Sequence, residues 1–214
     1  MLRIITGTAK NKHLLVPESA RPMMDRAKSA IFSMIQTRIP NSMVLDLYAG
    51  SGAMGLECLS RGAKFCRFVE ITEEGSSCIE QNAINCKFTK DEFKIEKTDV
   101  LNYLAKILHK KYRAEAKEND GIVELDEIKD AGKFDDIQKS IVVMDYDIIF
   151  VCPPHISVTN EALRLASRIL KKDGILIAEC PQDKELLSEI GDLYLEEKRN
   201  YGKTDIYFYL TKDS

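Results

Sequence analysis

Short apolar runs alternate along most of the chain with stretches in which apolar residues recur at helical spacing. The runs predict strands and the periodic stretches predict helices, because side chains repeat about every two residues in a strand and about every 3.6 residues in a helix. Predicted strands cover residues 43–45, 65–70, 93–96, 146–151, 175–180, 194–198 and 205–210. Predicted helices cover residues 53–59, 73–85, 101–108, 160–170 and 185–190. This alternation indicates an α/β fold with a parallel, doubly wound sheet covered on both faces.

The last two predicted strands differ from the others. Residues 194–198 and 205–210 flank Gly202 and alternate between apolar and polar positions. Such a pattern is typical of an antiparallel hairpin at the edge of a sheet. We therefore predict a Rossmann-like, mixed seven-stranded sheet with an antiparallel edge hairpin.

A smaller unit precedes this sheet. Strand-like runs at residues 2–6 and 13–16 flank a polar turn that carries Lys10 and Lys12, and they predict a hairpin. A stretch with helical spacing follows, and Pro40 ends it. The lysines of the turn are either phosphate contacts or part of a solvated loop.

These patterns divide the chain into an N-terminal hairpin-helix extension at 1–40 and a main domain at 41–214. Residues 112–144 interrupt the main domain with many charges and few aromatic residues. A structureless loop of this length is unusual in a compact domain, so we predict a charged surface insertion there.

Charge is distributed unevenly along the chain. The net charge is −3, but residues 1–40 hold seven Lys and Arg against two Asp and Glu. Residues 112–147 hold five Lys and Arg against eleven Asp and Glu. The basic N-terminal extension, rather than the overall balance, favours a nucleic-acid partner.

Composition excludes several classes of protein. Hydrophobic residues make up 44% and charged residues 30%, and no apolar run approaches the ~18 residues of a membrane span. The N-terminus lacks the apolar core of a signal peptide. The six cysteines form no C-x-x-C pair, so neither a zinc site nor a thioredoxin motif is indicated. We expect a reduced, cytoplasmic protein with no membrane segment and no metal.

The stretch Asp46-Leu47-Tyr48-Ala49-Gly50-Ser51-Gly52, called here the glycine loop, joins the first predicted strand of the main domain to its helix. Glycines allow sharp turns and the close approach of a ligand, and the helix N-terminus offers free N–H groups. The carboxyl ends of successive strands carry Asp46, Glu70, Asp99 and Cys152. Because ligands of doubly wound sheets bind at this edge, the sequence predicts a nucleotide-cofactor site.

Two cofactors fit this pattern to different degrees. Gly50 to Gly55 matches G-x-G-x-x-G, and Glu70 follows about 20 residues later, as in dinucleotide-binding folds. However, a carboxylate at Asp46 suits a cationic amino group better than a pyrophosphate, and Asp99 can accept a hydrogen bond from an adenine amine. S-adenosyl-L-methionine uses all four strand ends, so we favour it over a nicotinamide cofactor.

The sequence resembles the bacterial small-subunit (16S) ribosomal RNA guanine-N2 methyltransferases over nearly its whole length, apart from residues 112–144. The matching motifs are Arg3-Ile4-Ile5-x-Gly7, Arg21-Pro22-x-x-Asp25-Arg26, Ile31-Phe32, Val44-Leu45 with the glycine loop, Gly55-Leu56-Glu57-x-Leu59-Ser60-Arg61-Gly62-Ala63, and Tyr201-Gly202-x-Thr204-Asp205. The resemblance implies the class I methyltransferase fold, methylation of guanine N2, and ribosomal RNA or a small-subunit assembly particle as the partner.

The resemblance also assigns roles to individual residues. It implies that Asp46 and the loop glycines hold the methionine end of the cofactor, that Glu70 binds the ribose, and that Asp99 binds the adenine amine. The whole implied cofactor set is Asp46, Tyr48, Gly50, Ser51, Gly52, Glu70, Ile71, Asp99 and Val100. The implied RNA contacts are Arg3, Lys10, Lys12, Arg21 and Arg26. Methionines stand at 23 and 24 where the family usually has threonines, so the polar contacts of that segment differ.

The implied catalytic segment is Cys152-Pro153-Pro154-His155. The family has Asp or Asn before the two prolines and an aromatic residue after them. A side-chain acceptor there binds the N–H groups of the base amine, and the aromatic ring stacks on the flipped-out base. A neutral thiol is a poor acceptor, so Cys152 should bind an amine weakly.

Several alternatives follow from this departure. Activity persists at a lower rate with the Pro153 carbonyl as the main acceptor, the enzyme methylates a different base or a small molecule, or the protein binds cofactor and RNA without turnover. Cys152 could also be a nucleophile, as in cytosine-C5 methyltransferases, or a small residue with no chemical role.

Overall fold

The computed structural model describes residues 2–18, 25–118, 145–153 and 159–212. The strands are β1 (Met43–Leu47), β2 (Phe65–Glu70), β3 (Phe93–Lys97), β4 (Tyr146–Val151), β5 (Leu170–Pro181), β6 (Glu189–Ile190), β7 (Leu193–Tyr201) and β8 (Thr204–Thr211). The helices are α1 (Asp25–Met34), α2 (Ala53–Ser60), α3 (Glu73–Asn85), α4 (Val100–Glu118) and α5 (Thr159–Ser167). Of the segments predicted as strands or helices in the main domain, only 185–190 forms a different element.

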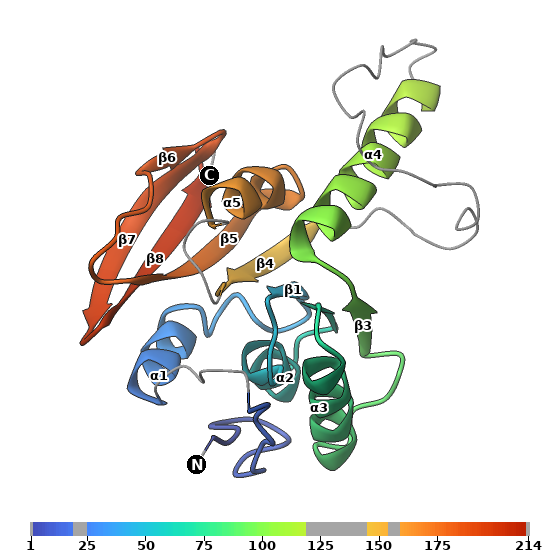
Figure 1. Ribbon diagram of the computed structural model, residues 1–214, viewed down its shortest axis with the longest axis vertical. Coiled ribbons are helices and arrows are strands. Elements are labelled where there is room, and N and C mark those ends of the chain that lie inside the picture. Colours follow the sequence, from blue (N-terminus) through green and yellow to red (C-terminus); the bar gives the residue numbers. More distant parts are fainter. Residues whose placement is uncertain (1, 19–24, 119–144, 154–158, 213–214) are drawn as a thin grey trace.

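All eight strands lie in one sheet in the order β3-β2-β1-β4-β5-β8-β7-β6 (Figure 1). The pairs from β3 to β5 are parallel, and β8, β7 and β6 continue the sheet in antiparallel pairs. The mixed α/β sheet with its antiparallel C-terminal hairpin is therefore confirmed. The prediction of seven strands was wrong by one.

The additional strand is β6, which lies in a segment predicted to be helical. Glu189 and Ile190 pair with Tyr194 and Leu193 across a tight turn in which Gly191 has φ 59°. A left-handed glycine in a two-residue turn favours a hairpin. The apolar spacing of six residues was too short to specify a helix against that turn.

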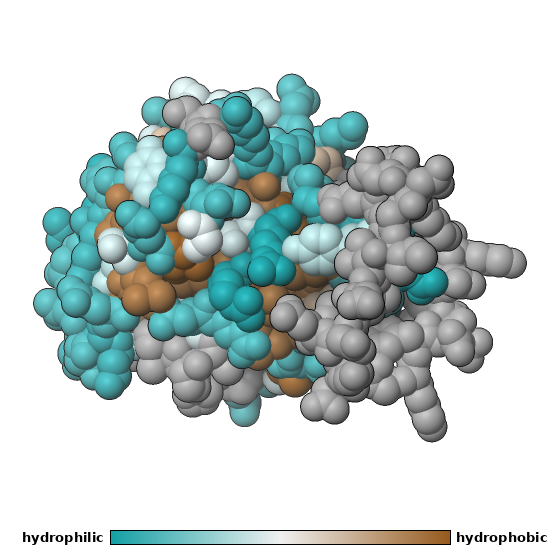
Figure 2. Space-filling model, turned by 90° about the horizontal axis from the view of Figure 1, so that it is seen from above, coloured by the Kyte–Doolittle hydropathy of each residue, from teal (hydrophilic) through white to brown (hydrophobic). Residues whose placement is uncertain are grey.

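Helices cover both faces of the sheet. Figure 1 shows α1, α2 and α3 on one side of the sheet and α4 and α5 on the other. Each side has its own buried apolar cluster: the first contains Ile31, Leu56 and Ile79, and the second contains Leu104 and Leu163. In the view of Figure 2, apolar residues show between hydrophilic ones on part of the surface, as is common for folded proteins.

Alternation along the central strands follows from this two-sided burial. In β4, Ile148 and Phe150 belong to the cluster under α1–α3, whereas Ile149 and Val151 belong to the cluster under α4 and α5. A parallel strand covered on both faces is apolar at nearly every position, as this one is. The side of the sheet that a polar residue faces can therefore be read from its apolar neighbours.

Helix α4 runs to Glu118, so the first residues of the predicted insertion at 112–144 continue a helix. The rest of that segment, 119–144, lies outside the described residues. Within the described part of the chain, no helix is long and apolar enough to cross a membrane.

Candidate functional site

Four polar side chains point to the same side of four adjacent strands. Asp46, Glu70 and Cys152 each follow the alternation of residues that face α1–α3, and Glu179 of β5 does the same. Their strands are neighbours in the order β2-β1-β4-β5, and the helices that follow the central pair, α2 after β1 and α5 after β4, lie on opposite sides of the sheet (Figure 1). Sequence reasoning missed Glu179, although it follows the apolar run 175–178 just as the other three follow theirs.

Asp46 is the most deeply buried of the four, with an exposed fraction of 2%. Its Oδ2 accepts a hydrogen bond from the N–H of Gly55 at 2.9 Å. Burial raises the pKa of Asp46, the Gly55 hydrogen bond lowers it and the charge of Glu70 raises it, which together bring it to about 7. A cation bound beside Asp46 would lower the pKa of this carboxyl, because a nearby opposite charge favours the ionised form.

The backbone of the glycine loop has positive φ angles that favour glycine. Gly50 and Gly52 have φ values of 55° and 75°, and a Cβ on Gly52 would lie 3.2 Å from Ile79. The third glycine of the motif, Gly55, has a different task. A Cβ there would lie 2.3 Å from the Phe68 ring, so this glycine lets α2 pack closely on β2.

Glu70 links the end of β2 to the glycine loop. Its Oε2 accepts from the N–H of Gly50 at 2.9 Å, and its Oε1 accepts from the N–H and the hydroxyl of Thr72 at 2.9 and 2.7 Å. Thr72 in turn caps α3 by accepting from the N–H of Gly75 at 3.0 Å. A carboxylate has about four acceptor positions, so Glu70 can still accept a hydrogen bond from a ligand. Ile71, next in the chain, is 62% exposed at this edge.

Tyr48 carries an unsatisfied donor. It has φ 59°, which is strained for a residue with a side chain, and its buried hydroxyl has no hydrogen-bond partner in the part of the chain that the structure describes. Burial, together with the charges of Asp99 and Glu161, raises the pKa of Tyr48 to about 12. The hydroxyl therefore stays protonated at neutral pH, where it can donate to a ligand.

Asp99 has a structural role. Its Oδ1 accepts from the N–H of Asn102 at 3.0 Å, which caps the first turn of α4. Val100 is 2% exposed and belongs to the cluster under α4 and α5. The predicted contacts of these two residues with adenine stay predictions.

Cys152 is partly buried at the end of β4. Burial raises the pKa of its thiol well above its ordinary value, and the charges of Glu179 and Asp46 raise it further, while a hydrogen bond from the Glu179 backbone lowers it. A neutral thiol is a weak nucleophile and a weak acceptor, so these surroundings oppose thiolate attack on a base. Pro153 follows within the described residues, whereas Pro154 and His155 lie outside them.

The N-terminal extension is fixed to α2 by a buried charged residue. The Glu57 carboxylate accepts from the N–H groups of Ile5 and Thr6 at 2.7 and 3.0 Å, and forms ion pairs with Lys28 at 3.0 Å and Arg61 at 2.8 Å. The side chains of Glu57 and Lys28 are fully buried.

The turn of the hairpin packs on the end of the same helix. Ser60 accepts from the N–H of Ala9 at 2.9 Å and donates to the carbonyl of Thr6 at 2.6 Å. Gly7 has φ 91°, and a Cβ there would lie 1.6 Å from the Ser60 carbonyl oxygen. Two motifs of the family, around Gly7 and around Glu57, thus contact one another. Leu2 and Ile4 also belong to the apolar cluster under α1–α3, so the N-terminal extension shares its core with the main domain. The domain boundary at residue 40 stays a prediction.

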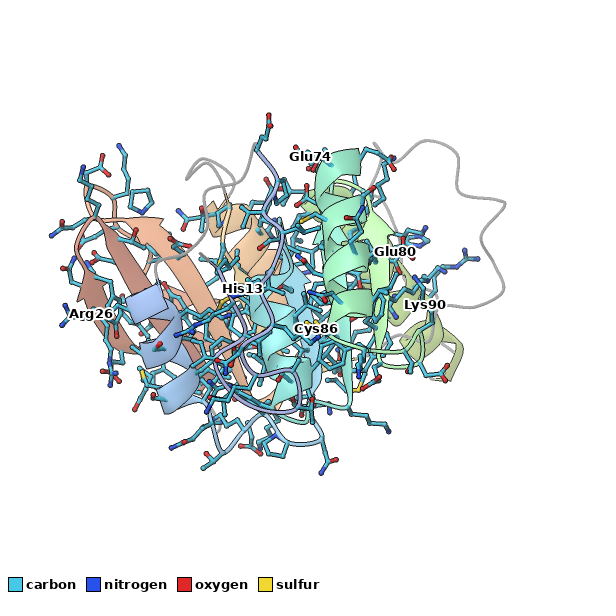
Figure 3. The ribbon with its side chains drawn as sticks, turned by 90° about the horizontal axis from the view of Figure 1, so that it is seen from below. His13, Arg26, Glu74, Glu80, Cys86 and Lys90 are labelled. Carbon is cyan, nitrogen blue, oxygen red and sulfur yellow. The ribbon has the colours of Figure 1, made fainter. Side chains whose placement is uncertain are left out.

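The predicted RNA contacts lie at different places. The runs 2–6 and 13–16, predicted as two strands, meet instead in a single antiparallel bridge between Arg3 and His13, and the turn with Lys10 and Lys12 lies at the C-terminal end of α2. The glycine loop lies at the other end of this helix, about 12 Å away by helical rise. Figure 3 shows Arg26 on α1, well apart from His13 and the end of α3 at Cys86. Arg21 lies outside the described residues.

A hollow of about 450 Å³ lies on the outer flank, between α3 and the edge strand β3. Its walls include Glu80 and Lys90, which form an ion pair and which Figure 3 shows side by side. It is separate from the side chains at the strand ends. Among the described residues, no group of three or more His, Cys, Asp and Glu could hold a metal ion.

Fold and site together define a class. The sheet is mixed, its parallel part has the strand order of a doubly wound fold, and carboxylates bind the backbone of the glycine-rich segment after β1, so the chain is an α/β protein of the doubly wound class. The chain belongs to the family described as conserved hypothetical protein 95, whose sequence model matches residues 2–116 and 105–210.

Similar proteins agree with this assignment. The chain is 29% identical over 213 residues to "Putative rRNA methyltransferase YlbH" of Bacillus subtilis, covering 97% of this chain and 98% of that protein. It is 25% identical over 202 residues to "Ribosomal RNA small subunit methyltransferase D" of Haemophilus influenzae, covering 92% and 88%. The solved structure of "Putative methyltransferase yhhF from Escherichia coli" has the same fold, with a TM-score of 0.72, 22% identity and coverage of 97% and 96%.

Proposed function

We propose that the protein is an S-adenosyl-L-methionine-dependent methyltransferase that acts on guanine N2 of small-subunit ribosomal RNA. One observation supports the cofactor part: the carboxyls of Asp46 and Glu70 both accept hydrogen bonds from backbone N–H groups of the G-x-G-x-x-G segment, those of Gly55 and Gly50. The names of the relatives support ribosomal RNA as the substrate.

The residues at the strand ends fit this cofactor. Asp46 would pair with its cationic amino group, Glu70 would accept from its ribose hydroxyls, and Ile71 would offer an apolar surface to its adenine. When bound, the cofactor supplies an electrophilic methyl group on a sulfonium sulfur, which keeps the bonding electron pair. The chain's own residues orient the base amine and exclude water, and alignment supplies much of the rate.

The test is methyl transfer by the purified protein. Labelled cofactor and under-methylated small-subunit particles should give labelled RNA, and digestion to nucleosides should give N2-methylguanosine. Calorimetry should show S-adenosylmethionine binding, whereas binding of a nicotinamide dinucleotide in its place would overturn the cofactor assignment. The proposal includes a cytoplasmic location, which the six free cysteines support.

A second candidate function is a cofactor- and RNA-binding protein without turnover. The neutral thiol of Cys152 favours it, because the family's acceptor side chain is missing at that position. Intact cofactor binding without transfer to any particle would select this candidate.

A further inference from the structure

Glu179 lies directly beside Cys152. Strands β4 and β5 pair in parallel with Val151 opposite Ala178, and Cys152 and Glu179 are the residues that follow this last pair. Both side chains face α1–α3, the side on which Asp46 and Glu70 lie. The two residues also interact, because the Glu179 backbone hydrogen-bonds the thiol and its carboxylate raises the pKa of Cys152. Glu179 is partly exposed and so is within reach of a ligand.

The Glu179 carboxylate provides the oxygen acceptor that the Cys152 thiol cannot provide. The amine of a base needs an oxygen acceptor, and ionised carboxylates accept much more strongly than thiols. We propose that Glu179, and not Cys152, accepts the N–H groups of the target guanine and is the catalytic carboxylate of this site. This inference rests on the proposed function.

A carboxylate here would also select the base. Guanine presents two adjacent donors, N1–H and N2–H, which match the two oxygens of a carboxylate. Adenine and cytosine present a donor next to an acceptor, whose lone pair a carboxylate repels. Sites that read a base by hydrogen bonds reject analogues that leave polar groups unpaired. The proton that N2 loses on methylation passes to Glu179, which becomes a neutral carboxylic acid and returns the proton to water.

The first test compares two Glu→Gln variants. Glu179→Gln should lower kcat/KM for transfer to under-methylated particles by roughly ten- to hundredfold, with cofactor affinity unchanged. Glu185→Gln is the matched control, since that side chain is 86% exposed on the loop after β5, and it should stay within about twofold of wild type. Glu179→Asp withdraws the carboxylate by one methylene and should give a smaller loss. An unchanged rate in Glu179→Gln overturns the inference.

The second test moves the carboxylate to the neighbouring strand. In the Glu179→Gln background, Cys152→Asp should restore much of the lost transfer. In the wild-type background the same change puts two carboxylates side by side, where one is forced to stay protonated, so the rate should not rise. A purely structural role for Glu179 predicts no rescue. A gain from Cys152→Asp in wild type equal to that in Glu179→Gln would also contradict the inference.

The third readout does not depend on turnover. Glu179→Gln should speed alkylation of Cys152 by iodoacetamide by at least about twofold, because it removes a charge that disfavours the thiolate. Mass spectrometry distinguishes Cys152 from the five buried cysteines. If wild type transfers no methyl group, the proposed function fails, whereas an unchanged alkylation rate contradicts the placement of Glu179 beside the thiol.

Discussion

The side-chain amide of Asn82, on α3, donates to the carbonyl oxygen of Ser51, in the glycine loop, at 2.9 Å. The same nitrogen donates to the carbonyl of Leu15 at 2.9 Å, and Oδ1 of Asn82 accepts from the N–H of Leu15 at 2.8 Å. One fully buried side chain thus connects the N-terminal extension, α3 and the loop.

This connection predicts a role for Asn82 in cofactor binding. Asn82→Ala would leave the polar backbone groups of Leu15 and Ser51 without their partner, and we expect cofactor affinity to fall by about tenfold or more as the loop relaxes. Asn85→Ala is the control, because Asn85 lies one turn later and makes an exposed bond with His13. Calorimetry of both variants decides the matter, and equal affinities would show that the loop holds its shape without Asn82.

The buried Lys28–Glu57 pair predicts a large effect on stability. Lys28→Met removes one partner and leaves the Glu57 charge buried with fewer compensating groups, so we expect the free energy of unfolding to fall by about 3 kcal/mol. Urea unfolding measures this change. The exposed Lys64 provides the comparison, and Lys64→Met should change the free energy by less than about 0.5 kcal/mol. A small loss in Lys28→Met would show that Arg61 and the hairpin N–H groups suffice for Glu57.

The sequence predicted the elements that depend on local hydrophobic pattern, but not the contacts that depend on residues far apart in the chain. Alternation and apolar runs predicted β1 to β5 and the edge hairpin, because those strands are covered on both faces or form a local turn. The hairpin groups that bind Glu57, Asn82 and Ser60 lie more than 50 positions earlier in the chain. No local pattern encodes such contacts, so the fixed extension could not be predicted. Glu179 could have been predicted, because it follows the apolar run 175–178 just as the other strand-end residues follow their own runs.

The pKa of Asp46 predicts a pH-dependent cofactor affinity. Near pH 7 about half of the unliganded protein carries a protonated Asp46, and only the ionised form attracts the cationic amino group of the proposed cofactor. Below pH 7 affinity should therefore fall toward tenfold per pH unit, and above pH 7 it should level off. Calorimetry at several pH values tests this. Asp46→Asn should bind more weakly at high pH with a flatter profile, and an equally steep profile in that variant would assign the effect to another group.

The same group predicts a trend in stability in the opposite direction. The pKa of Asp46 is raised on folding from 3.8 to about 7, so its contribution to stability is fully present below pH 3.8 and is lost as the pH rises toward and through 7. Relative to wild type, Asp46→Asn should therefore gain stability between pH 5 and pH 8, since Asn can still accept from Gly55 without ionising. Urea unfolding of both proteins at each pH gives the difference. A constant difference across this range would mean that the carboxyl ionises equally in both states.

The hairpin turn offers a test of RNA binding that leaves the cofactor site intact. Lys10→Glu with Lys12→Glu reverses two charges at the end of α2 opposite the glycine loop, so cofactor affinity should not change. If the turn contacts phosphates, affinity for small-subunit ribosomal RNA should fall and the slope of log affinity against log salt should decrease by roughly one per lost contact. Filter binding at several salt concentrations measures both. Because the turn lies about 12 Å from the loop along α2, such contacts require an RNA that extends past the target base across the face of α2. Unchanged binding and slope would place the RNA on another surface and identify the two lysines as part of a solvated turn.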